Sequence, residues 1–189
     1  AIHIRRYIMR TVVAENYLCF YAVLEMILSD IGIDVFSQYD LANRFGVVLP
    51  KGYHILNVHN VSFSEDVHDQ GAHIDEVKIN EFFTENKISL KVSYIAENPY
   101  IDYSYDKCDN FFAKKKLYCV YAFSYGDLYH EARNYNVGHI ALLRHSFPKD
   151  QIEIYDPGPR AAGIKIVSRF AMHDAMEAIR GGMYLFEKC

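Results

Sequence analysis

The sequence has no tryptophan, no Cys-x-x-Cys pair and only four cysteines among its 189 residues. Cysteines this few and this scattered exclude a disulfide scaffold and a structural zinc site. Their sparse use predicts a reducing setting, with the cytoplasm as the default location. The four cysteines are Cys19, Cys108, Cys119 and Cys189.

Long hydrophobic runs and an excess of positive charge are also missing. No apolar stretch approaches the ~20 residues of a membrane-spanning helix. The opening AIHIRRYIMR is positively charged but lacks the apolar core and small-residue cleavage site of a signal peptide. The net charge is −4 and the pI is about 6.1. We therefore expect neither a membrane nor nucleic acid as a partner.

The composition that remains is that of an ordinary globular protein, with 51% hydrophobic and 23% charged residues. A chain of this length predicts one domain over residues 1–189 with a substantial core. The one candidate insert is a loop over 50–73. It contains Gly52 and Gly71 and is rich in histidine.

Helical patterns fill the first half of the chain. A helix is predicted over 19–31, with Gly32 at its C-terminal end. Ser37 and Asp40 form a capping pattern for a second helix that ends at Gly46, and a third is predicted over 75–86. The apolar face of the first helix recurs with helical spacing at Cys19, Ala22, Val23, Met26 and Ile27.

Strand patterns dominate the second half. The near-continuous apolar run over 117–123 predicts a central strand. Residues 138–145 and 151–156 predict a β-hairpin with a turn between them. A helix after Ser168 and a last strand over 183–186 follow. Further strands are predicted over 87–95 and 164–167. Helices followed by an antiparallel sheet make an α+β fold.

Cys19 stands where a loop meets the first helix. The partial positive charge of a helix N-terminus stabilises a thiolate, which is the reactive form of cysteine. The backbone N–H groups there also suit an oxyanion. The alternative is a buried structural cysteine, because free cysteine is among the most buried residue types.

His139 and Asp156 gain meaning from the predicted hairpin. Taken alone, His139 is an ordinary strand residue and Asp156 an ordinary turn residue. A hairpin, however, brings the start of its first strand beside the end of its second. The pair is therefore expected to be in contact, so that Asp156 fixes the tautomer of His139 while the other ring nitrogen faces a nucleophile.

These residues resemble a known family. A cysteine opening a long apolar helix, a Gly-His strand and a strand ending in Tyr-Asp-Pro-Gly are similar to the papain-like cysteine peptidases. The nearest group is the bacteriocin-processing (double-glycine leader) peptidases. The resemblance implies N-terminal helices packed on a C-terminal antiparallel sheet, a Cys19–His139–Asp156 triad and no cofactor. The matching stretches are Ala14–Ser29, Gly138–Arg144 and Ile152–Gly158, followed by Ser168–Phe186.

The sequence departs from that family around Cys19. Leu18 and Phe20 stand where the family has Asp and Gly, and the oxyanion glutamine falls at Val13. Asn16 is the nearest amide side chain and is the candidate donor in its place. The scaffold also supports acyl transfer, deamidation and transglutaminase-like chemistry.

We therefore predict a cysteine-dependent hydrolase or acyltransferase. Its substrate would be a peptide or a small acyl or amide compound, attacked at an amide or thioester carbonyl. The alternative is a degenerate papain-like module that binds a peptide without cleaving it.

A metal site is the second chemical possibility. His68, Asp69 and His73 lie close together in the 50–73 loop, downstream of two more histidines. Gly71 interrupts them, and the two histidines do not have the helical spacing of an HExxH motif. Solvated loop histidines explain the pattern better, so no metal is predicted.

Overall fold

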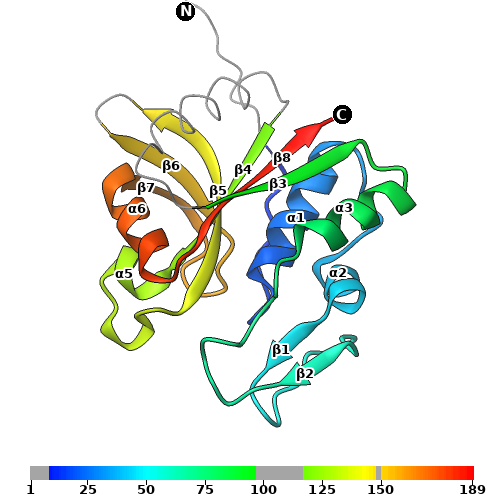
Figure 1. Ribbon diagram of the computed structural model, residues 1–189, viewed down its shortest axis with the longest axis horizontal. Helices are drawn as coiled ribbons and strands as arrows, with labels where there is room; N and C mark the ends of the chain where they lie inside the picture. The colour runs from blue at the N-terminus through cyan, green and yellow to red at the C-terminus, as the bar shows by residue number, and fades with distance from the viewer. Residues whose placement is uncertain (1–8, 97–116, 148–149) are drawn as a thin grey trace, which may run out of the picture.

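The computed structural model describes residues 9–96, 117–147 and 150–189. Its main element is a six-stranded sheet with the strand order β3-β8-β4-β5-β6-β7 (Figure 1). Each pair of neighbouring strands is antiparallel. The strands are β3 (Leu90–Ala96), β4 (Leu117–Ser124), β5 (Gly138–Phe147), β6 (Gln151–Asp156), β7 (Gly163–Ser168) and β8 (Gly182–Lys188).

Helices lie on both sides of this sheet. Figure 1 shows α1, α2 and α3 on one side, and α5 and α6 on the other. The predicted α+β class is therefore confirmed, with N-terminal helices packed against a largely C-terminal sheet. The helices are α1 (Cys19–Asp30), α2 (Gln38–Phe45), α3 (Glu76–Glu85), α5 (Tyr125–Tyr129) and α6 (Arg169–Ala178).

Two core clusters fill the space between the sheet and these helices. The first core cluster contains the buried residues of α1, α2 and α3, and the second contains those of α6. Strand β4 serves both, because Tyr118 and Val120 belong to the first cluster while Cys119 and Tyr121 belong to the second. Side chains alternate between the faces of a strand, so a strand covered on both faces needs the near-continuous apolar run that the sequence shows.

Local signals in the sequence set the helix ends. Gly32 follows α1 with φ +89°, a left-handed conformation that glycine adopts without strain. Ser37 and Asp40 form the predicted capping box of α2. Asp75 caps α3 and Ser168 caps α6 through their side chains. These helix predictions are confirmed to within a residue or two.

Two segments differ from the sequence predictions. The 50–73 interval, predicted as a loop, contains strand β2 (Val61–Phe63), which pairs in parallel with β1 (Val47–Leu49). This pairing was missed because a strand of three residues gives almost no periodic signal. No prediction was made for 125–134, where α5 and a 3₁₀ turn (Ala132–Asn134) lie.

Some predictions fall outside the described residues. The imperfect alternation over 2–13 predicts a short strand or an extended arm; the structure describes it only from Met9, and Met9 to Val13 form no strand. Residues 98–109, which are rich in Tyr and Asp, predict a surface segment and lie wholly outside the described residues. Of the helices in the described ranges, none has the length and apolar character to cross a membrane.

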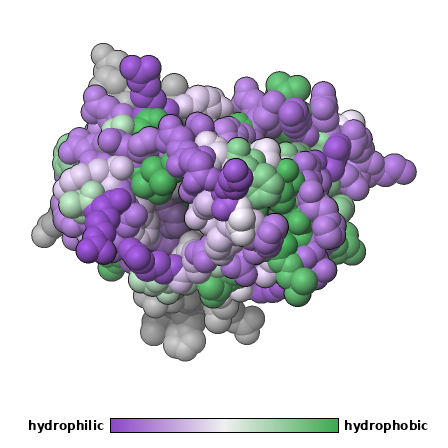
Figure 2. All heavy atoms as spheres, turned by 90° about the horizontal axis from the view of Figure 1, so that it is seen from below, coloured by the Kyte–Doolittle hydropathy of each residue, from purple (hydrophilic) through white to green (hydrophobic). Residues whose placement is uncertain are grey.

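The surface drawn in Figure 2 is mostly hydrophilic, with hydrophobic residues interspersed and a hollow near its centre. Several large hydrophobic side chains are exposed, among them Val35, Leu56 and Phe170. Single exposed apolar residues are normal on proteins and mark no docking site by themselves.

Candidate active site

The β5–β6 hairpin brings His139 and Asp156 into contact, as the sequence predicts. Leu142 pairs with Tyr155 in this hairpin, so the start of β5 and the end of β6 lie at the same end of the sheet. His139 Nε2 donates to Asp156 Oδ1 over 2.7 Å. The Asp156 side chain is 0% exposed and that of His139 is 11% exposed. Water therefore competes little for this hydrogen bond.

Asp156 also shapes the turn that follows it. The backbone N–H of Gly158 donates to Oδ1 of Asp156 over 2.8 Å, which is the Asx-turn pattern of aspartate. Gly158 has φ +78°, and a Cβ atom there would lie 2.8 Å from Cβ of Ala162. Glycine is thus required on both counts. The Asp-Pro-Gly sequence makes a turn and fixes a carboxylate in the same three residues.

Cys19 is the first residue of α1 and is partly exposed. Its side chain lies close enough to His139 to raise the pKa of that imidazole. Leu18 occupies the N-cap position and provides no side-chain cap, and the first turn contains no acidic residue. The N-terminal N–H groups of α1 therefore face the region of Cys19 with no carboxylate beside them.

The pKa values of His139 and Asp156 follow from these contacts. Burial disfavours protonation of His139, but hydrogen bonds to Asp156 and Cys19 and the negative charges of both groups outweigh it, raising the pKa of His139 to about 9. Burial would raise the pKa of Asp156, yet hydrogen bonds from His139, Tyr129 and Gly158 and the charge of His139 lower it to about 2. The arrangement therefore favours an ionised Asp156 beside a protonated His139.

The segment that leads to Cys19 is tied to the strand end that carries Asp156. The N–H of Ala14 donates to the carbonyl of Pro157 over 2.8 Å. The hydroxyl of Tyr155 donates to the carbonyl of Val12 over 3.2 Å. These two hydrogen bonds join residues that are far apart in the sequence, and they set the position of Cys19 relative to the hairpin.

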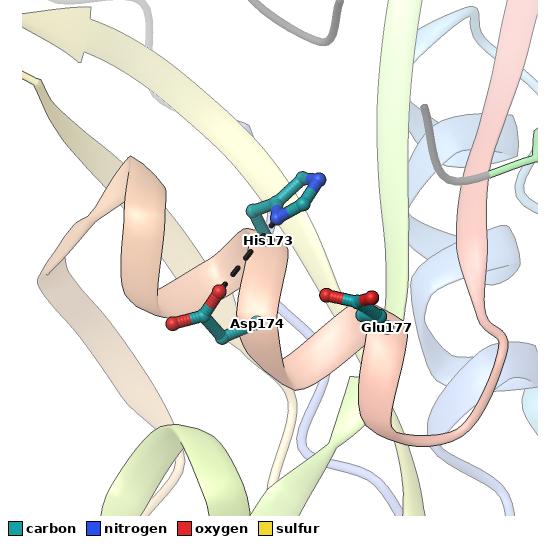
Figure 3. A group of neighbouring side chains, drawn as sticks. All are labelled: His173, Asp174 and Glu177. Atoms are coloured by element: carbon teal, nitrogen blue, oxygen red, sulfur yellow. Dashed lines mark ion pairs between the residues drawn. The ribbon is translucent and has the colours of Figure 1, made fainter. Parts of the chain in front are cut away.

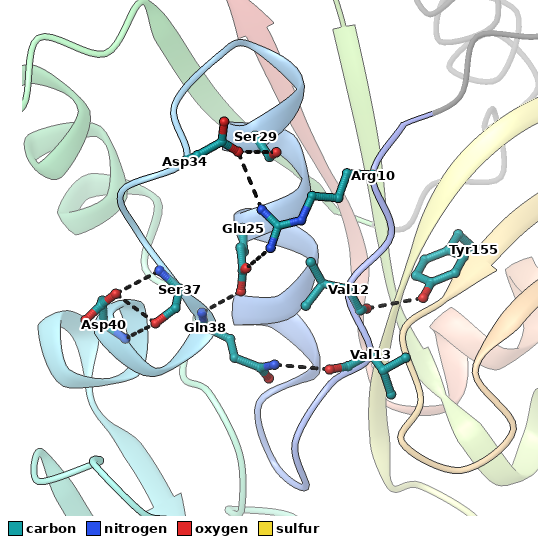
Figure 4. Close-up of polar contacts among 10 residues, drawn as sticks. All are labelled: Arg10, Val12, Val13, Glu25, Ser29, Asp34, Ser37, Gln38, Asp40 and Tyr155. Carbon is teal, nitrogen blue, oxygen red and sulfur yellow. Dashed lines mark hydrogen bonds and ion pairs between the residues drawn. The ribbon is translucent and has the colours of Figure 1, made fainter.

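Gln38 holds the same segment from the other side (Figure 4). Its Nε2 donates to the carbonyl of Val13 over 3.1 Å, and its Oε1 accepts from the N–H of Glu15 over 2.8 Å. Its own N–H donates to the buried Glu25 over 2.7 Å, and Glu25 pairs with Arg10 at 3.0 Å. Both ends of the buried Gln38 amide are thus engaged by backbone, so this residue fixes the loop.

Asn16, the candidate oxyanion donor, is exposed three residues before Cys19. Its Nδ2 donates to the hydroxyl of Tyr53 over 3.0 Å. The Tyr53 ring packs edge-on against Tyr17, with centroids 5.2 Å apart. An amide nitrogen carries two hydrogens, so one N–H of Asn16 is left for another acceptor.

The loop histidines bind backbone groups. His68 Nδ1 lies 2.9 Å from the carbonyl of Asn136, and His73 Nε2 lies 2.8 Å from the carbonyl of Asp69. Because a carbonyl only accepts, each of these nitrogens carries its proton and is not a metal ligand. These contacts tie His68 and His73 to the backbone of the protein.

One other group of potential metal ligands occurs within the described ranges. His173, Asp174 and Glu177 lie on α6 with ligand atoms within 4.8 Å of one another (Figure 3). Both carboxylates are exposed, and His173 Nδ1 lies 3.7 Å from Oδ1 of Asp174. A surface ion pair explains this arrangement, and no metal is assigned to it.

Two neighbours of Asp156 were missed in the sequence. The hydroxyl of Tyr129 donates to Oδ2 of Asp156 over 2.6 Å, and Nζ of Lys165 lies 3.3 Å from the same oxygen. Tyr129 ends a five-residue helix and Lys165 lies on an edge strand. Neither position carries a motif, and only the predicted strand over 164–167 placed Lys165 near the sheet.

Comparison with known proteins shows a likeness of fold to solved structures. The fold matches the crystal structure of a candidate C39-like peptidase from Bacillus anthracis, with a TM-score of 0.60 and 12% sequence identity. The match covers 96% of this chain and 95% of that one. No family model matches the sequence, and no curated protein matches it. The likeness shows a shared fold, while the narrower resemblance to bacteriocin-processing peptidases stays a prediction.

Proposed function

We propose that this protein is a cysteine-dependent hydrolase or acyltransferase in which Cys19 is the nucleophile, His139 the general base and acid, and Asp156 the orienting group. The observation that carries the proposal is the double engagement of His139. One ring nitrogen is bound to a buried carboxylate, and the thiol at the start of α1 lies close enough to raise the pKa of the same ring. A nucleophile, a base and an orienter on separate elements suit covalent acyl chemistry.

The tautomer of His139 supports this assignment of roles. Nε2 faces the carboxylate of Asp156, which only accepts, so Nε2 carries a proton. Nδ1 is then the nitrogen that can receive the proton of Cys19. The pKa of His139, raised to about 9, keeps the imidazole protonated at neutral pH beside Cys19.

The reaction follows from these groups. The Cys19 thiolate attacks a carbonyl carbon, and the backbone N–H of Cys19 and the remaining N–H of Asn16 bind the oxyanion. Imidazolium His139 gives its proton to the leaving group as the tetrahedral intermediate collapses to a thioester. Water or an amine, deprotonated by His139, then attacks the thioester and releases the free thiol.

The substrate class is a peptide or a small amide or thioester. The structural neighbour, a candidate C39-like peptidase, favours a peptide carbonyl. The partly exposed Cys19 is consistent with access by a peptide chain.

Alkylation tests the nucleophile. We expect iodoacetamide at about pH 6 to modify Cys19 at least tenfold faster than the exposed Cys189, measured by peptide-resolved mass spectrometry. Most ordinary thiols are protonated at this pH and react slowly. Cys19→Ala should abolish the fast reaction and Cys189→Ala should preserve it. Equal rates at Cys19 and Cys189 would contradict an activated thiolate.

Acylation tests the reaction class. A peptide thioester should transfer its acyl group to Cys19, giving an intact-mass increase that hydroxylamine removes. Cys19→Ala should show no such adduct. Fast alkylation without acylation by any member of a peptide, amide and thioester panel would instead favour a binding module with a reactive cysteine.

A further inference from the structure

The second oxygen of the Asp156 carboxylate has partners that the triad does not use. Oδ1 accepts from His139 and from the N–H of Gly158. Oδ2 accepts from the hydroxyl of Tyr129 over 2.6 Å and from Nζ of Lys165 over 3.3 Å. A carboxylate offers about four acceptor positions. With a fully buried side chain, Asp156 is therefore saturated by protein donors alone.

The two donors to Oδ2 also contact each other. Nζ of Lys165 lies 4.1 Å from the centroid of the Tyr129 ring, within the range of a cation–π interaction. Asp156 pairs with Gly163 across β6 and β7, so Lys165 is its diagonal neighbour on the same face. Lysine is long enough to span this diagonal. The Lys165 side chain is only 24% exposed, and its charge therefore acts on Asp156 with limited screening by solvent.

Such a contact has two physical consequences for the proposed triad. Donors on Oδ2 prevent the carboxylate from rotating, which keeps Oδ1 on His139. They also withdraw negative charge from the side that faces the imidazole. An isolated buried carboxylate would hold the imidazolium so firmly that return of the proton to a leaving group would be slow, since proton transfer is efficient when the acid is near balance with the operating pH.

We propose that Tyr129 and Lys165 are positioning residues, which clamp Oδ2 of Asp156 so that Oδ1 stays on His139 and the imidazole can both take up and give back a proton. The inference rests on the proposed function of Cys19, His139 and Asp156. Tyr129 and Lys165 act through Asp156 and make no contact with a substrate in this scheme.

Other charged and titratable groups face the same region as Tyr129 and Lys165. Cys19 approaches His139 from α1. Tyr125 packs edge-on against the His139 ring at 5.1 Å, and it feels the charges of Glu131 and Arg160. Arg160 and Glu131 form an ion pair at 2.9 Å. The opposite charges of that pair largely cancel. Besides His139, Lys165 is therefore the cation bound directly to the Asp156 carboxylate.

The test is the pH profile of Cys19 alkylation in the full-length protein. Lys165→Met removes the charge and keeps an unbranched stem, and Tyr129→Phe removes only the hydroxyl. Both changes leave more negative charge on the Asp156 oxygen that faces His139, so His139 should lose its proton at a higher pH. We expect the pH at which reactivity changes on the alkaline side to rise by on the order of one pH unit in Lys165→Met and by less in Tyr129→Phe. Lys165→Arg should restore the wild-type profile.

A structural role alone would give a different result. Tyr118→Phe is the matched control, because the Tyr118 hydroxyl also donates to an aspartate, Asp30, over 2.5 Å, and Tyr118 belongs to the first core cluster whereas Tyr129 packs against the second. It should lower the melting temperature and leave the pH profile unchanged. Lys188→Met, on the exposed end of β8, is the control for loss of a strand lysine.

The outcomes separate this inference from the proposed function. A wild-type Cys19 that is no more reactive than Cys189 would refute the proposed function. A reactive wild-type Cys19 with unchanged profiles in Lys165→Met and Tyr129→Phe would refute only the clamp. If one of these two variants fails to fold, the other decides: a profile that stays within about 0.2 pH units of wild type overturns the inference.

Discussion

Replacing Asp156 with asparagine removes one buried negative charge and keeps the shape of the side chain. In the wild-type protein this carboxylate is 0% exposed and lies 2.7 Å from Nε2 of His139. The variant leaves His139 with a neutral partner, so the imidazolium loses its main electrostatic support. Under the proposed mechanism, less of Cys19 should then be in the reactive thiolate form.

The size of the effect follows from the contact. Two unit charges about 4 Å apart attract by roughly 4 kcal/mol at an effective dielectric constant near 20. Each ~1.4 kcal/mol corresponds to a factor of ten. Orientation of the ring by the remaining neighbours, Phe123 and Tyr125, will preserve part of the geometry. We therefore expect alkylation of Cys19 at about pH 6 to fall by 10² to 10³ in Asp156→Asn.

Iodoacetamide rates at Cys19 and Cys189 measure this directly within one sample. Cys189 should react equally in wild type and variant, which corrects for differences in reagent and concentration. Circular dichroism and urea unfolding establish that the variant is folded. If folded Asp156→Asn alkylates Cys19 within threefold of the wild-type rate, Asp156 does not support the imidazolium and the electrostatic reasoning is wrong.

Two further predictions concern pH and the oxyanion. The pKa of His139 rises from 6.5 to about 9 on folding, so the stability that His139 contributes is present below pH 6.5 and is lost as the pH rises toward 9. The pKa of Asp156 falls from 3.8 to about 2, so the stability that Asp156 contributes is present above pH 3.8 and is lost as the pH falls toward 2. Urea unfolding should show a maximum between these limits that declines by on the order of 2 kcal/mol on each side. Asp156→Asn should reduce both declines, because it removes the Asp156 carboxylate and the charge that supports a protonated His139. Asn16→Ala should slow acylation of Cys19 by a thioester at least tenfold and leave the alkylation rate within twofold of wild type, because alkylation forms no oxyanion. Equal losses of rate in both reactions would assign Asn16 a structural role.

The hairpin explains why part of the site was predictable from the sequence. A strand start and the end of the next strand must meet when the turn between them is short, and this constraint alone joined His139 to Asp156. The helix start at Cys19 followed from apolar spacing that begins at that residue and from Gly32 at the other end. These predictions depend on local sequence and on one pairing, so no long-range information was needed.

Lys165 shows why the remainder was not predictable. In β7, isoleucines 164 and 166 are 55% and 58% exposed, while Lys165 points to the more buried face. Hydrophobic alternation would place the isoleucines inside and the lysine outside. Here Lys165 faces inward and the isoleucines face outward, because the inner face holds the Asp156 carboxylate, whose position depends on β6. Tyr129 was not predictable for another reason, because a five-residue helix gives no periodic signal in the sequence.

The proposed site joins two separately packed halves, and this division has consequences for mutants. Cys19 lies on α1 and packs against the first core cluster, whereas Phe123, whose ring meets that of His139, belongs to the second. The hydrogen bonds of Val12 and Ala14 to the end of β6 connect the two. Loosening this connection should change the distance from the thiol to the imidazole and lower reactivity at every pH. Loosening the Tyr129 and Lys165 clamp changes the charge on Asp156 and should move the pH at which reactivity changes. The shape of a mutant's pH profile, more than its rate at one pH, therefore tells which half of the site has been disturbed.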